Sequence, residues 1–270
     1  MTGTTEVHSR PDSGSDRYRG EYDADVVARW DALIGWQARR ESEGDFFVDL
    51  LRRQGARRVL DAACGTGFHA VNLARAGFEV AAADGAAAMV ARTRENLARY
   101  GLDLPVTTCD WRELDRIVAR PFDAILCLGN SIAHLFDEAD RKATLAQFHK
   151  ALAPDGFLIV DHRNYDALLS AGTGSKTRQG YCCCGNDTAV ALDVVDDELV
   201  TITYRIGGEH AFHLDTFPLR CAQVRDLLER AGFAATTTFG DFRRNFDIDD
   251  VEFFVHVAYK ATEDRGGDRG

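Results

Sequence analysis

Hydrophobic residues follow two different periods along this chain. Between Asp25 and about Arg53 they recur every three or four positions, which predicts helices. Beyond Gly55, short apolar runs alternate with further helical stretches. The runs that we predict to be strands are 58–61, 78–83, 106–109, 122–128 and 157–161.

Helical periodicity fills the gaps between these strands. One helix ends at Gly77, a second spans 86–100, and a third carries Leu145 and Phe148 on one face. The segment 154–156 is predicted as the turn from the third helix into the last strand. Because strands alternate with helices, the predicted fold class is α/β, with a doubly wound, Rossmann-like parallel sheet and helices on both faces.

The pattern changes again in the last third of the chain. Short alternating runs at 189–195, 199–204 and 213–217, with a tight turn at Gly207-Gly208, predict a small antiparallel insert. We expect this insert to lie over the mouth of the main sheet. The elements predicted after it are a helix at 223–231 and strands at 234–239 and 253–259.

Composition and charge argue against several classes of protein. Hydrophobic residues make up 45% of the 270, enough for a core without a disulfide or metal staple. The 43 acidic and 32 basic side chains give a net charge of −11, which disfavours binding to phosphate backbones. No apolar run approaches the ~20 residues of a membrane helix, and the polar N-terminus does not resemble a secretory signal. The seven cysteines lack zinc-type spacing. We therefore expect a cytoplasmic protein that binds no nucleic acid, membrane or metal.

A glycine-rich loop joins the first strand to the helix after it, where α/β folds bind ligands. Gly65, Gly67 and Ala70 satisfy the pattern of a dinucleotide site, so a nicotinamide cofactor is one interpretation and a tight turn without a ligand is another. Asp61 can reach a ligand amine, directly or through water, and Asp84 can accept hydrogen bonds from ribose hydroxyls. A ligand with a ribose and an ammonium but no phosphate explains both acids. S-adenosylmethionine is such a ligand.

Several stretches carry a family resemblance. Residues 59–67 resemble motif I of class I S-adenosylmethionine-dependent methyltransferases. The stretches 127–135 (CLGNSIAHL) and 161–166 (DHRNYD) resemble signatures of glycine N-methyltransferases. Over roughly 18–260 the chain is similar, more narrowly, to the bacterial glycine/sarcosine N-methyltransferases. The further segments that carry this likeness are Trp30, 40–47 (RESEGDFF), 217–220 (FPLR), 240–242 (GDF) and 253–257 (FFVHV).

The resemblance implies a class I methyltransferase fold in one domain, 18–261. Its expected parts are an N-terminal helical lid (18–54), a cofactor-binding core (55–166), an insert over the acceptor pocket (167–219), and a closing helix and strands (220–261). The polar ends, 1–17 and 262–270, are expected to be disordered tails.

Carried over residue by residue, the resemblance implies a site for S-adenosylmethionine, with S-adenosylhomocysteine as the product. Arg40 would meet the methionyl carboxylate, Asp84 the ribose, and Asp110 and Trp111 the adenine. Without the resemblance, Arg40 would be interpreted as a surface arginine, Trp111 as core, and His134 as a packed histidine. The implied cofactor contacts are Tyr22, Trp30, Arg40, Ala63, Gly65, Gly67, Asp84, Asp110, Trp111, Leu128 and His134.

The resemblance also implies a small amino acid as the methyl acceptor. Arg163 would hold its carboxylate through two hydrogen bonds, and Asn130 would offer its amide to the carboxylate or the amine. Tyr181 and Tyr204 would close the pocket around the developing ammonium, with ordinary packing as the alternative role. The implied reaction transfers methyl groups to glycine and sarcosine, the first steps of betaine synthesis.

One departure from the family pattern concerns the acceptor. Family members usually carry a tyrosine shortly after the 240–242 segment, where this chain has Arg243, Arg244, Asn245 and Phe246. The acceptor is therefore less determined than the cofactor. The alternatives are a methyltransferase of the same fold that acts on another small amine or amino acid, and a binding module without catalysis. The sequence leaves the oligomeric state open.

Overall fold

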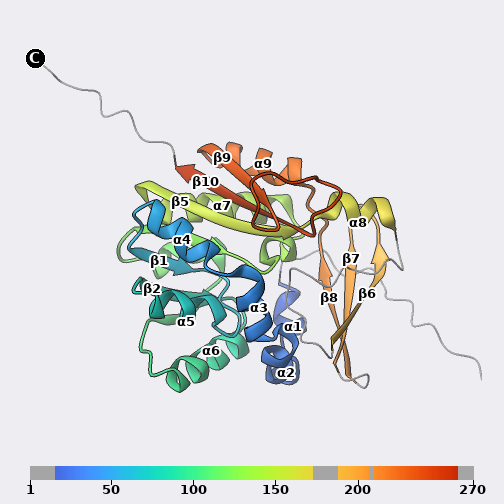
Figure 1. Cartoon of the computed structure of the whole chain (residues 1–270), viewed down its shortest axis with the longest axis horizontal. Coiled ribbons are helices and arrows are strands. Elements are labelled where there is room, and N and C mark those ends of the chain that lie inside the picture. Colours follow the sequence, from blue (N-terminus) through green and yellow to red (C-terminus); the bar gives the residue numbers. More distant parts are fainter. Residues whose placement is uncertain (1–15, 173–187, 207–209, 261–270) are drawn as a thin grey trace, which may run out of the picture.

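The computed structural model describes residues 16–172, 188–206 and 210–260, and a seven-stranded sheet runs through its centre (Figure 1). The order across the sheet is β3-β2-β1-β4-β5-β10-β9. The first five of these strands are parallel, whereas β10 is antiparallel to both of its neighbours. The strands are β1 (Arg58–Asp61), β2 (Glu79–Asp84), β3 (Val106–Thr108), β4 (Phe122–Cys127), β5 (Leu152–Arg163), β9 (Phe233–Gly240) and β10 (Phe253–Lys260).

Alternate residues of the central strands are buried against helices on opposite faces of the sheet. Leu60 and Val160 belong to one apolar cluster, and their neighbours Val59 and Ile159 belong to the other. This two-sided burial explains the nearly continuous apolar strands and confirms the doubly wound fold. The covering elements are α4 (Phe46–Arg53) and α5 (Phe68–Arg75) on one face, and α7 (Glu138–Ala151), α9 (Cys221–Arg230) and the 3-10 helix η1 (Trp111–Arg116) on the other.

The N-terminal helices and the insert lie together beside the main sheet. Figure 1 shows the three-stranded antiparallel sheet standing next to the larger one, with α1 close to β8. Leu33 and Ile34 share an apolar cluster with Ile202 and Tyr204 of the insert. The elements involved are α1 (Tyr18–Glu21), α2 (Ala24–Ile34), α3 (Trp36–Glu43), β6 (Thr188–Val195), β7 (Val200–Ile206) and β8 (His210–Thr216). A further helix, α6 (Ala87–Arg99), packs beside α2, β2 and β3.

Most predicted elements are confirmed to within a residue or two, and the main exception is β5. Residues 154–156 were expected to form a turn, but β5 already begins at Leu152, which pairs with Phe122. The register shifts between Phe122 and Ala124, so the expected turn is an irregularity inside a longer strand. The sequence pattern also missed α8 (Tyr165–Ala171) and the short 3-10 helix η2 (Ser131–His134). The expected turn at 207–208 lies outside the described residues.

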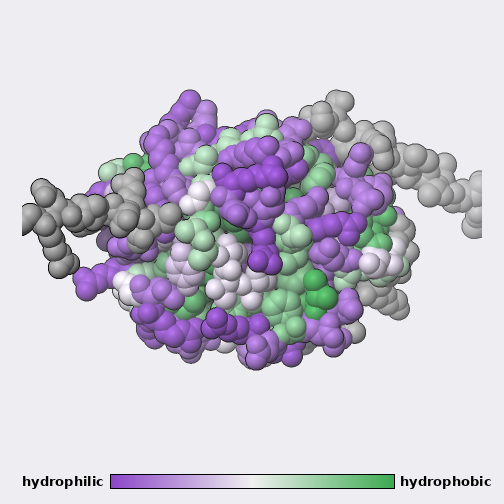
Figure 2. Space-filling view, turned by 90° about the horizontal axis from the view of Figure 1, so that it is seen from above, coloured by the Kyte–Doolittle hydropathy of each residue, from purple (hydrophilic) through white to green (hydrophobic). Residues whose placement is uncertain are grey.

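The outer surface is mixed in character. The face seen from above in Figure 2 is mostly hydrophilic, with hydrophobic residues in groups between the polar ones. Within 16–172, 188–206 and 210–260, no helix is both long and apolar enough to cross a membrane. Over the same ranges, no group of three or more His, Cys, Asp or Glu side chains is arranged to hold a metal ion.

Candidate active site at the carboxyl ends of the strands

A cavity of about 110 Å³ opens where the parallel strands end. β1 ends at Asp61, β2 at Asp84 and β5 at Arg163, and these ends share one edge of the sheet because the strands run the same way. A smaller pocket adjoins the cavity and shares Tyr22, Ala63, Asp84, Ser131 and His134 with it. The sequence-predicted residues that line the larger cavity are Tyr22, Trp30, Ala63, Gly65, Asp84, Leu128, Asn130, His134, Arg163 and Tyr204.

Asp84 ties the end of β2 to the glycine loop. Its carboxylate accepts hydrogen bonds from the backbone N–H groups of Gly65 and Ala86, each at 2.9 Å. Burial raises the pKa of Asp84 to about 6. Asp84 lines the cavity, and because of its raised pKa mildly acidic solution protonates it.

The two glycines of the loop have different roles. Gly65 (φ +53°) lines the cavity, and a Cβ there would lie 4.0 Å from Nε1 of Trp30. Gly67 (φ +94°) precedes α5 and does not line the cavity, contrary to the expectation from the resemblance. A Cβ at Gly67 would meet the Thr93 methyl at 3.0 Å, so helix packing and backbone conformation explain this glycine.

Asp61 lies fully buried behind the same loop and does not line the cavity. The backbone N–H groups of Ala63 and Ala70 approach its carboxylate, whereas no side-chain donor among the described residues does. Burial raises the pKa of Asp61, and the nearby charges of His69 and Arg39 oppose that rise. A carboxylate this deeply buried is costly to keep ionised, and a cationic ligand group beside it would offset that cost.

The N-terminal helices supply the aromatic side of the cavity. The hydroxyl of Tyr22 lies 2.9 Å from Nε2 of His134, and the ring of Trp30 meets Tyr22 edge-on at 5.1 Å. Burial lowers the pKa of His134 to about 4 and raises that of Glu21, 3.6 Å from its Nδ1, to about 7. His134 is therefore neutral near pH 7 and connects the first helices to the sheet.

The structure corrects the prediction for Arg40. Arg40 is exposed, forms hydrogen bonds with Asn72 and Asp45 on the outer surface, and lies outside the cavity. Its neighbour Arg39 is buried and lines the cavity instead. Successive helical residues point about 100° apart, so the two adjacent arginines cannot share one environment.

Arg39 belongs to a buried polar triad. Its Nε donates to Glu43 at 2.5 Å, and the other Glu43 oxygen lies 2.9 Å from Nε2 of His69. Burial would raise the pKa of Glu43, but Arg39 and His69 lower it to about 2. The sequence analysis missed Arg39, although the spacing of Arg39 and Glu43 is that of a helical ion pair.

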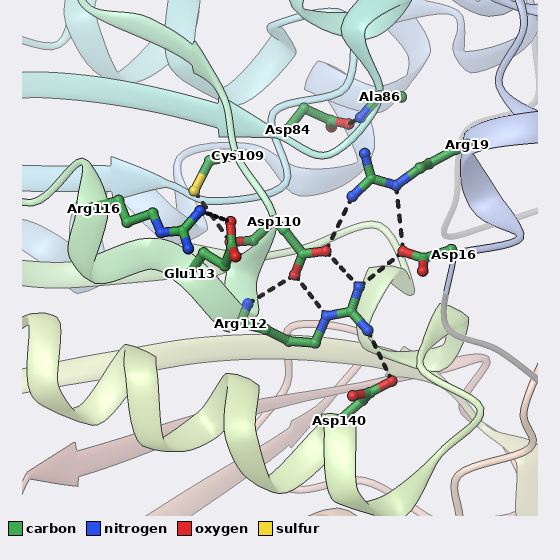
Figure 3. A network of polar contacts seen from close by, with 10 residues as sticks. All are labelled: Asp16, Arg19, Asp84, Ala86, Cys109, Asp110, Arg112, Glu113, Arg116 and Asp140. Carbon is green, nitrogen blue, oxygen red and sulfur yellow. Dashed lines mark hydrogen bonds and ion pairs between the residues drawn. The ribbon is translucent and has the colours of Figure 1, made fainter.

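Asp110 and Trp111 line the smaller pocket, and Asp110 belongs to a network of charged side chains (Figure 3). Asp110 accepts hydrogen bonds from Arg112 and, at 3.1 Å, from Arg19 of α1. Although burial opposes the shift, Arg112 lowers the pKa of Asp110, which therefore stays ionised. Nε1 of Trp111 donates to the carbonyl oxygen of Ala62 at 2.6 Å, which orients the indole.

Asn130 and Arg163 meet on the opposite side of the cavity. Asn130 has a left-handed backbone (φ +64°). Its side-chain oxygen accepts from the N–H of Arg163 at 2.9 Å, and its NH₂ donates to the Tyr165 hydroxyl at 2.7 Å. Asn130 thus positions the start of α8 and the end of β5, in addition to lining the cavity. Tyr165 lies within the 161–166 signature, but the sequence did not indicate a role for it.

Two of the other residues predicted to hold the acceptor, Arg163 and Tyr204, line the cavity. Arg163 is buried, and its guanidinium lies 4.9 Å from the ring centroid of Phe253, a lining residue that the prediction missed. Tyr204 lines the cavity and stacks on Phe212 at 5.2 Å. Tyr181 lies outside the described residues.

The departure at Phe246 lies away from the cavity. Its ring packs against Phe254 at 5.9 Å and covers Gly240. Phe246 is not among the residues that line the cavity. Its effect on the acceptor would therefore be indirect.

Comparisons with known proteins show which family the chain belongs to. Residues 59–156 match the family model described as a methyltransferase domain. The glycine/sarcosine N-methyltransferase of Aphanothece halophytica is 46% identical over 91% of this chain and 92% of its own length. The chain belongs to the glycine/sarcosine N-methyltransferase family. The family member from Halorhodospira halochloris is also 46% identical, over 91% of both chains. A solved S-adenosylmethionine-dependent methyltransferase from Clostridium acetobutylicum shares the fold, with a TM-score of 0.68 at 18% identity over 88% of this chain and 98% of that one.

Proposed function

We propose that this chain transfers methyl groups from S-adenosylmethionine to glycine and then to sarcosine, the first steps of betaine synthesis. The observation that carries the proposal is the buried Arg163, which lines the same cavity as the glycine loop. A buried guanidinium inside a small cavity suits an anionic ligand group, and glycine and sarcosine each offer one carboxylate. Membership of the family supports the same substrates.

The residues of the cavity fit S-adenosylmethionine. An amino acid moiety carries an ammonium and a carboxylate. The carboxylate complements the buried Arg39 in the cavity, and the ammonium complements Asp61 behind the glycine loop, directly or through water. Asp84 would accept hydrogen bonds from the ribose hydroxyls, and the smaller pocket with Asp110 and Trp111 would take the adenine. When bound, this cofactor supplies an electrophilic methyl group on a sulfonium sulfur.

The N-terminal segment 18–54 is proposed as a lid over that cofactor. Tyr22, Trp30 and Arg39 all line the cavity from this segment. Arg19 of α1 and Arg112 of η1 both contact Asp16 and Asp110, which anchors the first helix beside the smaller pocket (Figure 3). The two contacts of Arg19 are exposed and can be exchanged with water, as entry of a cofactor requires.

The acceptor amine needs no dedicated base in this arrangement. Arg163 would bind the carboxylate, and its positive charge disfavours the ammonium form of the bound amine. His134 is already engaged by Tyr22, and Tyr204 would enclose the amine with its ring and hydroxyl. Holding two reactants in attack geometry can supply about 7–11 kcal/mol in favourable cases, so positioning carries most of the catalysis.

The decisive experiment is an acceptor panel. The purified protein is incubated with S-adenosylmethionine and, separately, with glycine, sarcosine, N,N-dimethylglycine, alanine, glycinamide and methylamine, and products are identified by mass spectrometry. We expect methylation of glycine and sarcosine. Glycinamide and methylamine, which lack the carboxylate, should react poorly. Efficient methylation of methylamine would overturn the assignment of Arg163, and a protein that methylates none of them would be a binding module.

A further inference from the structure

A row of polar side chains crosses three neighbouring strands and ends on the backbone of Arg163. Thr238 of β9 pairs with His256 of β10. His162 of β5 pairs with Phe254, two residues before His256, so the two histidines lie on the same face of the sheet as diagonal neighbours. The Thr238 hydroxyl lies 2.9 Å from Nδ1 of His256, and the two Nε2 atoms lie 2.9 Å apart. Nδ1 of His162 lies 2.8 Å from the carbonyl oxygen of Arg163.

With both rings neutral, only one placement of protons satisfies all three hydrogen bonds. The carbonyl oxygen of Arg163 accepts, so Nδ1 of His162 carries the proton and its Nε2 is the acceptor in the neutral ring. Nε2 of His256 must then donate to it, which leaves Nδ1 of His256 to accept from the Thr238 hydroxyl. Both rings are fully buried, and burial lowers the pKa of His162 to about 4 and that of His256 well below its ordinary value. Both histidines are therefore neutral near pH 7, as this placement requires.

The row of hydrogen bonds from Thr238 through the two histidines completes the support of the Arg163 backbone. Its N–H is held by the side chain of Asn130 at 2.9 Å and its carbonyl oxygen by His162, so side chains fix both backbone groups of this residue. Two apolar side chains would fill the space of the two histidines without the cost of burying polar groups. Such a buried network is worthwhile where one exact arrangement of the backbone is needed.

We propose that Thr238, His256 and His162 form a positioning chain that sets where Arg163 presents its guanidinium to the acceptor carboxylate. The proposal rests on the function proposed above for Arg163. None of the three residues lines the cavity, so they act through Arg163 and touch neither the acceptor nor the cofactor.

Four variants separate positioning from mere stability. Thr238→Val removes only the terminal donor, and Thr236→Val is its matched control, two residues away on the same strand and similarly half-buried. His256→Leu breaks the chain, whereas the amide of His256→Gln can donate to His162 and accept from Thr238. Each variant is assayed for kcat and for KM of glycine and of S-adenosylmethionine, with thermal unfolding measured on the same preparation.

We expect the KM of glycine to rise about fivefold in Thr238→Val and about tenfold or more in His256→Leu, and to return to within about twofold in His256→Gln. The KM of S-adenosylmethionine should stay within about twofold in all four, and Thr236→Val should match the wild type. Lower thermal stability with an unchanged KM of glycine would overturn the positioning chain. If His256→Leu does not fold, the KM of glycine in Thr238→Val and His256→Gln still tests the positioning role.

The tautomers give an independent readout. Nitrogen–proton correlation spectra of the wild type should show His162 protonated at Nδ1 and His256 at Nε2. The reverse tautomers would overturn the positioning role of Thr238, His256 and His162 while leaving the proposed function intact. A wild type that turns over another acceptor but not glycine would instead overturn the proposed function, and the positioning role with it.

Discussion

The carboxylate of Asp84 accepts a hydrogen bond of 2.9 Å from the backbone N–H of Gly65, nineteen positions earlier in the chain. This bond joins the end of β2 to the glycine loop at the cavity wall, so it fixes the position of the loop relative to the carboxylate. It also consumes only part of the carboxylate's capacity, since an ionised carboxylate offers about four acceptor positions. The remaining positions are available to ribose hydroxyls.

Replacement of Asp84 tests the cofactor site. Asp84→Asn keeps the volume but removes the ionised acceptor, so affinity for S-adenosylhomocysteine should fall at least about tenfold at pH 7.5. The measurement is titration calorimetry on a variant that unfolds cooperatively. An unchanged affinity would refute the assignment of Asp84.

The pH dependence of the same affinity gives a signed prediction. Burial raises the pKa of Asp84 to about 6, so this group is protonated below that pH and ionised above it. Because the ionised form is the better acceptor, wild-type affinity should weaken as the pH falls from about 7 to 5. Asp84→Asn should show a flatter profile over the same range. Parallel slopes for both proteins would assign the titration to another group.

The adjacent arginines provide a matched pair of variants. Arg39→Lys keeps a charge for Glu43 but loses the planar fork, so affinity for S-adenosylhomocysteine should fall about tenfold. Arg40→Lys changes an exposed side chain outside the cavity and should leave affinity within about twofold. Titration calorimetry of S-adenosylhomocysteine with both variants shows which arginine contacts the cofactor. The opposite result would favour the residue expected from the sequence resemblance.

Arg163 is tested through the acceptor. Arg163→Lys should lose at least about 30-fold in kcat/KM for glycine, because lysine cannot form the two-pronged carboxylate contact. Affinity for S-adenosylmethionine should stay within about threefold, since other residues hold the cofactor. A parallel loss of both would identify Arg163 as a cofactor or structural residue. If neither changes, the acceptor is not a small carboxylate.

The proposed lid is tested by limited proteolysis. Trypsin has sites within 18–54 at exposed arginines such as Arg29, Arg40 and Arg52. Saturating S-adenosylhomocysteine should slow cleavage there at least about fivefold, because the ligand stabilises the closed form. Cleavage at Arg230, on the far helix α9, serves as the internal control. Equal slowing at every site would indicate general stabilisation without a lid.

The sequence by itself determined the order of the elements and many of the residues that line the cavity. Local periodicity located most of the strands to within a residue or two, with β5 as the main exception, because residues buried on both faces must be apolar over the whole strand. Asp84, Asn130 and Arg163 could be predicted as neighbours, because parallel strands bring their carboxyl ends to one edge. The family signatures then named the ligand classes.

Tertiary structure alone decided which of several similar side chains faces the cavity. The order of Arg39 and Arg40 along the chain cannot show which is buried, because that depends on the rotation of α3 against the sheet. Gly67 follows the motif but serves helix packing against Thr93, a residue 26 positions later. The link from His256 to His162 forms only because antiparallel pairing of β10 with β5 sets their register. Such long-range packing leaves no local pattern in the sequence, since its energy comes from contacts between distant segments.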